Sequence, residues 1–514
     1  MTGQGDQPAG RLRSVFRWLM EPGKSLGSRA VNAGLWASAL SVSMRLLRLV
    51  RTVLLARLLA PNDFGLMGIA VITLSMIEAF TKTGINQALI QRKGKIDDYL
   101  STAWTVGVLR GLILGGVLIA GAPLAARFFG SPEAVALIRV IGLIPIAHGL
   151  TNVGVVFFDK ELQFRQRFLF RSLPAIVELA VSVALALWLR NVWALLLGRV
   201  IAQIVTMVAS YVAHPYRPRF RLDKTRAREL MRFGKWIWVS SILIYLMLNL
   251  DDIMVGRLLS PEDLGLYQMA FTISTLVTIE IAHVVNQVAF PAFSKIQSDP
   301  QALGRAYLET VQLVAFAALP MAAGLWFVGP VAVETLLGEN WLGLLPAYGP
   351  LLIWGLVRSV TSSANALFAS IGKPSVNAAM YAFVTVLLAI FIFPFTMSWG
   401  IAGAAWATVI AAGGFVVQYA LASRKLKTGW RSVVRPVAIP ATITAVMLLA
   451  LKSVTALLPE SESTWLLVWA PALGAIVYSL GVMTAQRYFD YTPLKVLSRF
   501  ARRHRDEASG ENEQ

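Results

Sequence analysis

Residues 30–66 read AVNAGLWASALSVSMRLLRLVRTVLLARLLAPNDFGL, and this stretch decides how the rest of the chain is interpreted. Most of it is apolar, and it is long enough to cross a bilayer as a helix. Arg45, Arg48 and Arg51 nevertheless lie inside it. An arginine that faces lipid at the middle of a helix costs about 3 kcal/mol on insertion scales. Steps of three residues keep the three guanidinium groups on one side of a helix, so we expect that side to face a wet, protein-lined cavity suited to an anion.

The composition indicates a membrane protein. The chain has 514 residues, of which 56% are hydrophobic and only 15% are charged. The apolar residues gather in blocks of about twenty, the length that a membrane helix needs, and the alternation typical of membrane β-strands is absent. We therefore predict an all-α polytopic membrane protein with about fourteen transmembrane helices. The predicted spans are 30–58, 65–90, 100–121, 133–158, 170–189, 192–214, 235–257, 264–290, 307–328, 344–371, 375–397, 400–422, 436–457 and 464–485.

The charges between the spans predict the orientation. Basic residues concentrate in alternate gaps, most of all in 215–234, and the opposite gaps hold few of them. Basic loops remain in the cytoplasm, so we expect both termini to be cytoplasmic. The net charge of +19 then reflects membrane orientation, since no basic stretch interleaves with stacking aromatics and no nucleic-acid partner is expected. Cysteine is absent, which excludes disulfides, thiolate catalysis and cysteine-based metal sites.

An internal repeat divides the chain. RLLAPNDFGL at 57–66 matches RLLSPEDLGL at 257–266, and in both copies the proline and aspartate favour a capped helix start. Six predicted spans separate the copies, so both halves enter the membrane in the same direction, and substrate sites of such parallel repeats lie between them. The predicted organisation is an N-terminal cytoplasmic segment (1–29), an N-lobe of helices 1–6 (30–214), a basic cytoplasmic linker (215–234), a C-lobe of helices 7–12 (235–422), helices 13–14 (436–485) and a cytoplasmic tail (486–514).

Arginines at membrane depth are the candidate substrate-binding residues. A guanidinium group grips a phosphate or diphosphate in bidentate fashion, and a cluster of them suits an anionic headgroup. The predicted cationic cavity is lined by Arg45, Arg48, Arg51, Arg110, Arg139 and Arg358. The alternative is that some of them form structural ion pairs, for example Arg51 with Asp251 or Asp252.

Acidic residues of the second half are candidates for ion coupling. Asp251, Asp252 and Glu280 lie at membrane depth, where carboxylates commonly take up a proton or Na⁺ that resets a transporter. Their spacing leaves H⁺ and Na⁺ both open. The chain has no GxxxxGK[ST] or HExxH motif, so we expect neither a catalytic site nor a cofactor, and a gradient rather than ATP as the energy source.

Several motifs resemble those of a known transporter family. They are GLW at 34–36, LARLL at 55–59, DFGL at 63–66, GINQALIQRK at 84–93, FGKW at 233–236, FPAFSKIQ at 290–297 and LVRSV at 356–360. With the duplicated lobes, they resemble the polysaccharide-transporter branch (Wzx-type, colanic-acid-like flippases) of the multidrug/oligosaccharidyl-lipid/polysaccharide exporter superfamily.

The resemblance implies a substrate and a location. Such proteins flip undecaprenyl-diphosphate-linked oligosaccharide from the cytoplasmic to the periplasmic leaflet of the bacterial inner membrane, for exopolysaccharide, capsule or O-antigen assembly. It implies two lobes that rock between inward-open and outward-open states. The expected partners are the lipid-linked oligosaccharide, membrane lipids and the polysaccharide synthesis machinery.

Three other functions stay open at this point. A cation-coupled multidrug exporter of the same superfamily would need an acidic or aromatic cavity, and the first helix has the opposite charge. A membrane glycan polymerase or ligase usually needs a large periplasmic loop, whereas the predicted periplasmic gaps are short. An inactive scaffold that recruits synthesis enzymes would lack transport altogether.

Overall fold

The structure is a computed structural model that describes residues 43–81, 84–92, 96–161, 163–276, 278–426, 429–457 and 465–489. These residues form helices and connecting turns, and they contain no β-strand. The predicted segment 1–29, the start of the first predicted helix and the chain beyond 489 lie outside the described residues. The all-α fold class is confirmed.

The first half begins with a helix over residues 43–58. The elements that follow are α3 (Pro61–Phe80), α4 (Ile85–Gln91), α5 (Asp97–Phe128), α6 (Ala134–Ile141), α7 (Leu143–Leu150), η1 (Val153–Val155), α8 (Val156–Lys160), α9 (Phe164–Leu189) and α10 (Trp193–Ala213). Residues 133–158, predicted as one span, are a broken helix, because the chain bends by 71° between Ala134–Leu150 and Val153–Lys160. The bend places α8 beside α4 and α9.

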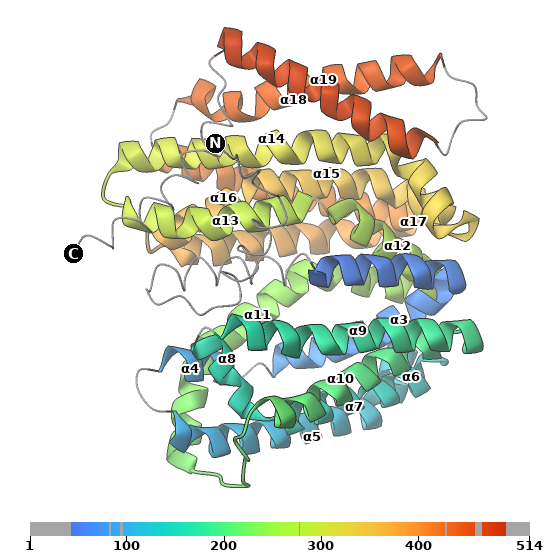
Figure 1. Ribbon diagram of the computed structural model, residues 1–514, viewed down its shortest axis with the longest axis vertical. Helices are drawn as coiled ribbons and strands as arrows, with labels where there is room; N and C mark the ends of the chain where they lie inside the picture. The colour runs from blue at the N-terminus through green and yellow to red at the C-terminus, as the bar shows by residue number, and fades with distance from the viewer. Residues whose placement is uncertain are drawn as a thin grey trace, which may run out of the picture.

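The second half begins with α11 (Lys224–Leu258), a helix that occupies the later part of the predicted linker. It continues with α12 (Pro261–Thr275), α13 (Thr278–Lys295), α14 (Pro300–Ala332), η2 (Val333–Leu337), η3 (Glu339–Leu344), α15 (Leu345–Thr361), α16 (Ser363–Ser370), α17 (Pro374–Lys425), α18 (Trp430–Thr455) and α19 (Leu466–Phe489). In Figure 1, α5–α10 lie in one half, α13–α17 in the other, α11 runs obliquely between them, and α18 and α19 form the outer edge.

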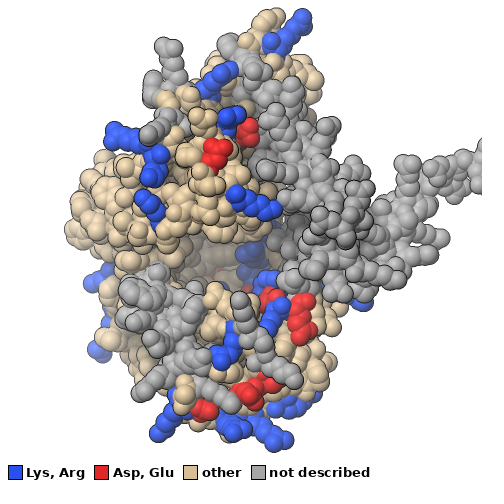
Figure 2. All heavy atoms as spheres, turned by 90° about the vertical axis from the view of Figure 1, so that its left-hand side faces the viewer, with Lys and Arg blue, Asp and Glu red and all other residues tan. Residues whose placement is uncertain are grey.

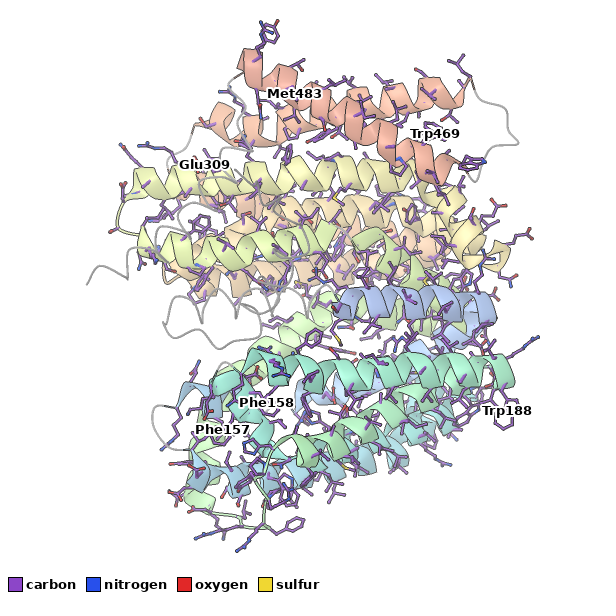
Figure 3. All side chains as sticks on the ribbon, in the orientation of Figure 1. Phe157, Phe158, Trp188, Glu309, Trp469 and Met483 are labelled. Carbon is purple, nitrogen blue, oxygen red and sulfur yellow. The ribbon has the colours of Figure 1, made fainter. Side chains whose placement is uncertain are left out.

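The helices suit a bilayer in length and polarity. Among the described residues, nine helices are long and apolar enough to cross a membrane, or eleven if each of two bent pairs is one span. The 52-residue α17 breaks at Trp399 and Gly400, between the predicted spans 375–397 and 400–422. Large apolar side chains such as Trp188 and Met483 point outward, with 80% and 65% of their surface exposed (Figure 3). The protein is a multi-pass membrane protein, and the count of fourteen spans stays a prediction.

The repeated motif builds the contact between the two halves. Its predicted helix cap is confirmed: the Asp63 carboxylate accepts from the Ala60 N–H at 3.0 Å, and the Asp263 carboxylate accepts from the Ser260 N–H at 3.2 Å. Beyond the caps, α3 packs directly against α12. A Cβ atom built on Gly65 would lie 1.6 Å from the Pro261 carbonyl oxygen, so the crossing has no room for a side chain.

Further contacts join the halves at the same end of the molecule. The Trp341 indole N–H donates to the Ala56 carbonyl at 2.9 Å, and its ring packs edge-on against Phe64 at 5.1 Å. Arg57 donates through Nε to the Leu336 carbonyl at 2.8 Å. We call this set of contacts, together with the α3–α12 crossing, the closed end. Passage between the halves on this side requires these contacts to separate.

Candidate functional site

A cavity of about 700 Å³ lies mainly in the first half and reaches α11. Its wall is formed by residues of α3, α4, α5, α7, α8, α9, α10 and α11. Figure 2 views the end of the molecule opposite the closed end and shows a hollow between the two halves with basic side chains at its wall. The acidic, basic and histidine residues that line the cavity are Glu78, Arg110, His148, Asp159, Arg167 and Arg171. Three guanidinium groups against two carboxylates leave the described lining with an excess of one positive charge.

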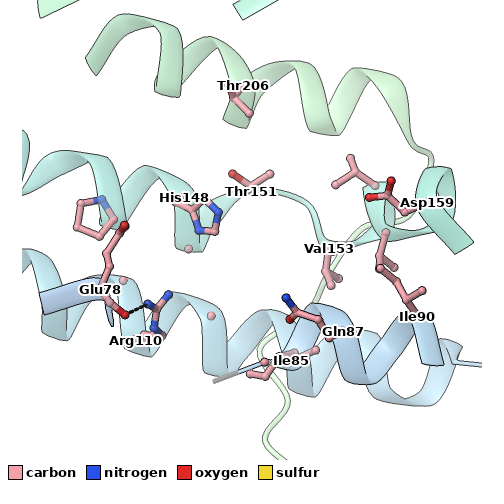
Figure 4. A pocket seen from close by; sticks show the side chains of 18 of the residues that line it. Glu78, Ile85, Gln87, Ile90, Arg110, His148, Thr151, Val153, Asp159 and Thr206 are labelled. Atoms are coloured by element: carbon pink, nitrogen blue, oxygen red, sulfur yellow. Dashed lines mark hydrogen bonds between the residues drawn. The ribbon is translucent and has the colours of Figure 1, made fainter. Parts of the chain in front are cut away.

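The deep part of the cavity holds Arg110, Glu78 and His148 (Figure 4). Arg110 donates through Nε to the Thr81 carbonyl at 2.9 Å and through Nη2 to the Thr81 hydroxyl at 3.2 Å and the Glu78 carbonyl at 3.4 Å. Two guanidinium nitrogens are therefore fixed by the end of α3, which sets the plane of the group. The ordered guanidinium loses little side-chain entropy when it binds an anion.

The mouth of the cavity carries a second basic cluster. Asp159 lies at the end of α8, and Arg167 and Arg171 lie on the first turns of α9. Arg167 Nη1 is 2.9 Å from Asp159 Oδ1, and Arg171 Nη2 is 3.9 Å from Oδ2. We call these three residues the mouth cluster.

The arginines predicted on the first helix occupy a different place. Arg45 forms an ion pair with Glu280 of α13, and Arg51 forms one with Glu178 of α9. Arg48 is exposed and donates to the carbonyl of Met44 at 3.2 Å. None of the three arginines is among the residues that line the cavity. Two of the three charges are thus balanced by acids from distant helices, and a substrate-binding role for this group stays a prediction.

Of the six predicted substrate-binding arginines, the structure brings Arg110 to the described cavity. Arg139 lies exposed on α6, outside the lining. Arg358 lies on α15 in the second half, where its guanidinium stacks over the Phe415 ring at 4.3 Å from the centroid. The roles of Arg139 and Arg358 therefore stay predictions without support from the cavity geometry.

The candidate coupling residues divide into two groups. Asp251 is 4% exposed and accepts from the Tyr267 hydroxyl at 2.8 Å, and its other oxygen has no hydrogen-bond partner among the described residues. Asp252 follows it on α11 and is half-buried, so the chain carries two successive carboxylates at this point of the helix. Glu280 is in contact with Arg45, as described above. Asp251 and Asp252 are thus available for a proton or cation, while Glu280 is already paired with a cation.

Sequence reasoning missed most of the acids and arginines of the cavity wall. The predicted span 170–189 leaves Arg167 in a loop, whereas α9 begins at Phe164 and includes it. The available signal was the spacing of Arg167 and Arg171, four residues apart and therefore on one helix face. Asp159 lies on the preceding helix α8, which ends at Lys160, four residues before α9 begins.

Comparisons with known proteins agree with this architecture. A protein-family model described as "Polysaccharide biosynthesis protein" matches residues 54–346. The lipopolysaccharide biosynthesis protein WzxC of Escherichia coli (strain K12) is 25% identical over 371 residues, 71% of this chain and 74% of that protein. The succinoglycan biosynthesis transport protein ExoT of Rhizobium meliloti (strain 1021) is 26% identical over 309 residues, 60% and 62% of the two chains.

Solved structures share the fold. The lipid II flippase MurJ in an inward closed conformation superimposes with a TM-score of 0.73 at 16% identity, covering 89% of this chain and 99% of that one. An inward-facing multidrug resistance MATE family transporter superimposes with a TM-score of 0.60 at 16% identity, covering 75% and 94%. Both are transporters, and at this identity the likeness concerns the fold alone.

Proposed function

This chain belongs to the polysaccharide biosynthesis family that matches residues 54–346, and from that premise we propose that it flips undecaprenyl-diphosphate-linked oligosaccharide across the membrane. The direction is from the cytoplasmic to the periplasmic leaflet, for exopolysaccharide, capsule or O-antigen biosynthesis. The observation that carries the proposal is a cavity with an excess of positive charge in its described lining, closed at one end, inside an apolar helical protein. The names of its relatives, which refer to lipopolysaccharide biosynthesis and succinoglycan transport, support it.

The charge distribution supports an orientation. The mouth of the cavity lies where α4 leads to α5 and α8 leads to α9, in gaps rich in basic residues. The positive-inside rule assigns these gaps to the cytoplasm, with both termini on that side. The described conformation is then open toward the leaflet where the lipid-linked oligosaccharide is assembled. Separation of the closed end would release the oligosaccharide on the other side.

Arg110 is the proposed deep contact for the diphosphate. Its guanidinium is held at a fixed angle by α3 and lines the cavity beside His148. A preorganised guanidinium in a site of low dielectric binds a phosphate oxygen more strongly than a flexible side chain in water does. Removal of this charge should therefore weaken substrate binding, and the loss of its bonds to Thr81 and Glu78 should lower the stability of the fold as well.

Coupling to an ion gradient is proposed for Asp251 and Asp252. Two successive carboxylates on one helix repel each other when both are charged, so uptake of H⁺ or Na⁺ relieves that repulsion. Tyr267 of α12 holds one of them, and α12 also forms the crossing with α3. A change of charge at this pair therefore acts close to the contact between the halves.

The multidrug exporter remains the second candidate because the MATE transporter shares the fold. A cavity for cationic drugs would be acidic or aromatic, and here three arginines line the wall against two acids. The cavity charge therefore favours an anionic substrate.

The proposal is tested in cells that lack this protein. We expect polysaccharide export to stop and the lipid-linked oligosaccharide to accumulate with its sugar on the cytoplasmic face, where a glycosidase reaches it only in everted vesicles. The wild-type gene should restore export. Accumulation on the periplasmic face instead would indicate a polymerase or ligase, and unchanged export would refute the proposal.

A further inference from the structure

The mouth cluster places one carboxylate between two cations. Arg167 and Arg171 are four residues apart on α9, so their side chains lie on one face of the helix. Each guanidinium faces a different oxygen of Asp159, at 2.9 and 3.9 Å. The carboxylate thus bridges the two arginines in the way that a small bidentate anion would. All three residues line the cavity.

The mouth cluster has more positive charge and more hydrogen-bond donors than the Asp159 carboxylate satisfies. Two guanidinium groups face a single carboxylate, which leaves one positive charge unbalanced. Arg167 Nε and Asp159 Oδ1 are both buried without a hydrogen-bond partner among the described residues, so the approach of Arg167 Nη1 to Oδ1 at 2.9 Å is an ion pair and not an aligned hydrogen bond. The Arg171 side chain is 50% exposed and reaches Asp159 only at 3.9 Å, which is too long for a hydrogen bond. Buried donors normally have partners, so an acceptor with more oxygens than a carboxylate would satisfy this site better.

The depth of the cluster matches a lipid headgroup. The apolar span of α9 runs over Arg165–Leu189, so Arg167 and Arg171 lie within about 9 Å of its start, at about 1.5 Å per residue. The headgroup region of a bilayer is about 5–8 Å thick on each side. Because Arg167 and Arg171 lie in the first two turns of this span, their long side chains can extend to the level of the lipid phosphates.

The surrounding wall suits the apolar part of such a lipid. Ile90, Val155, Phe158 and Phe170 line the cavity near the cluster, and the Phe158 and Phe170 rings meet edge to face at 6.1 Å. A soluble anion gains nothing from such a wall, whereas the first units of an isoprenoid chain bury apolar surface on it. Arg110 lies further along the same cavity and can receive the headgroup next.

We propose that Arg167 and Arg171 form a first binding station for the diphosphate of an isoprenoid lipid, which Asp159 occupies when no lipid is bound. The inference rests on the proposed function and adds a site to it. The diphosphate carries more charge and more oxygens than the carboxylate, so it displaces Asp159 from the two arginines. Asp159 acts as an internal competitor that pairs with the two arginines when no lipid is bound.

Binding of a C15 isoprenyl diphosphate to the purified full-length protein in detergent tests the station. Arg171→Gln should weaken binding about tenfold, since a charge-assisted hydrogen bond is lost. Asp159→Asn should tighten binding severalfold, because the competitor is removed. Arg165→Gln is the matched control: Arg165 is exposed on the same helix and does not line the cavity, so binding should stay within about twofold of wild type.

The Asp159→Asn variant distinguishes binding from a structural role. If the cluster only fixes the turn between α8 and α9, this variant lowers the melting temperature and leaves the affinity unchanged or weaker, which overturns the station. Equal affinity for isoprenyl monophosphate would overturn the diphosphate assignment. Equal affinity for inorganic pyrophosphate would overturn the role of the lipid.

Failure of the station and failure of the proposed function have different signatures. If wild-type protein translocates the lipid-linked oligosaccharide while Arg171→Gln and Asp159→Asn bind and translocate like wild type, only the station is refuted. If wild-type protein neither binds the isoprenyl diphosphate nor translocates the oligosaccharide, the proposed function is refuted with it.

Discussion

Replacement of Gly265 by alanine tests whether the α3–α12 crossing holds the cavity shut at the closed end. A Cβ atom on residue 265 would lie 2.0 Å from the Pro61 carbonyl oxygen and 2.9 Å from the Gly65 nitrogen. Ordinary van der Waals contact begins at 3.4 Å, so the helices must separate by about 1.4 Å to admit the methyl group. The clashing atoms belong to the backbone, so a change of side-chain rotamer cannot relieve the clash.

The expected energetic effect is that of an overpacked interior, about 1–3 kcal/mol. This penalty applies to the conformation in which the halves touch and is relieved when they part. The equilibrium between the two conformations should therefore move about 5- to 150-fold toward the one that is open at the opposite side. Gly116→Ala is the control: this glycine lies in α5 with nothing within 4 Å of its added Cβ, so the helix gains propensity without a clash.

A single introduced cysteine can report the shift, because the chain has no cysteine of its own. Thr206 lines the cavity on α10 (Figure 4), and Thr206→Cys provides the thiol. We expect Gly265→Ala to raise its labelling by an impermeant maleimide added from the side of the closed end, and Gly116→Ala to leave it unchanged. If Gly265→Ala folds and labels like the parent protein, the crossing is not a gate.

Three further substitutions or conditions have defined outcomes. Arg110→Gln should lower transport at least tenfold in protein that still folds, with a melting temperature lowered by the loss of its bonds to Thr81 and Glu78. Arg139→Gln changes an exposed residue outside the cavity and should leave transport unchanged; equal effects of the two variants on transport would remove Arg110 from the binding path. Asp251→Asn should abolish the response of transport to an imposed H⁺ or Na⁺ gradient, and a response that persists would exclude Asp251 from coupling. The pKa of His214 is lowered, mainly because the imidazole is buried; Glu161 opposes this shift and Arg217 adds to it. The neutral imidazole accepts a hydrogen bond from the Tyr216 N–H at 3.2 Å. This stabilisation is complete above pH about 6.5 and is lost as the pH falls through the lowered pKa. The hydrogen-exchange protection factors of residues 214–223, which are corrected for the intrinsic slowing of exchange in acid, should therefore fall in wild type but not in His214→Gln.

The sequence could predict the architecture because its signals are local or periodic. The length of the apolar blocks, the break before residues 400–422 and the capped helix start at Asp63 and Asp263 each depend on neighbours within one or two turns. The repeat also predicted that residues 57–66 and 257–266 occupy equivalent positions in the two halves. It could not indicate that Gly65 and Gly265 meet each other, because that contact depends on how two helices cross.

The candidate site was predicted less well, for two physical reasons. Glu178 and Glu280 balance Arg51 and Arg45 from helices far away in sequence, and the register between helices decides such pairs. At the mouth, the helix α9 starts six residues before the predicted span, which turns apparent loop charges into part of the cavity wall. Arg110 was predicted because a charge at mid-helix depth needs a wet surrounding wherever its neighbours lie.

The most direct measurement places purified protein in liposomes with a fluorescent oligosaccharide linked to undecaprenyl diphosphate. We expect wild-type protein to carry the sugar from the leaflet at the mouth of the cavity to the opposite one, where an impermeant quencher reaches it, and Arg110→Gln to do so at least tenfold more slowly. Transfer no faster than in liposomes without protein would contradict the account.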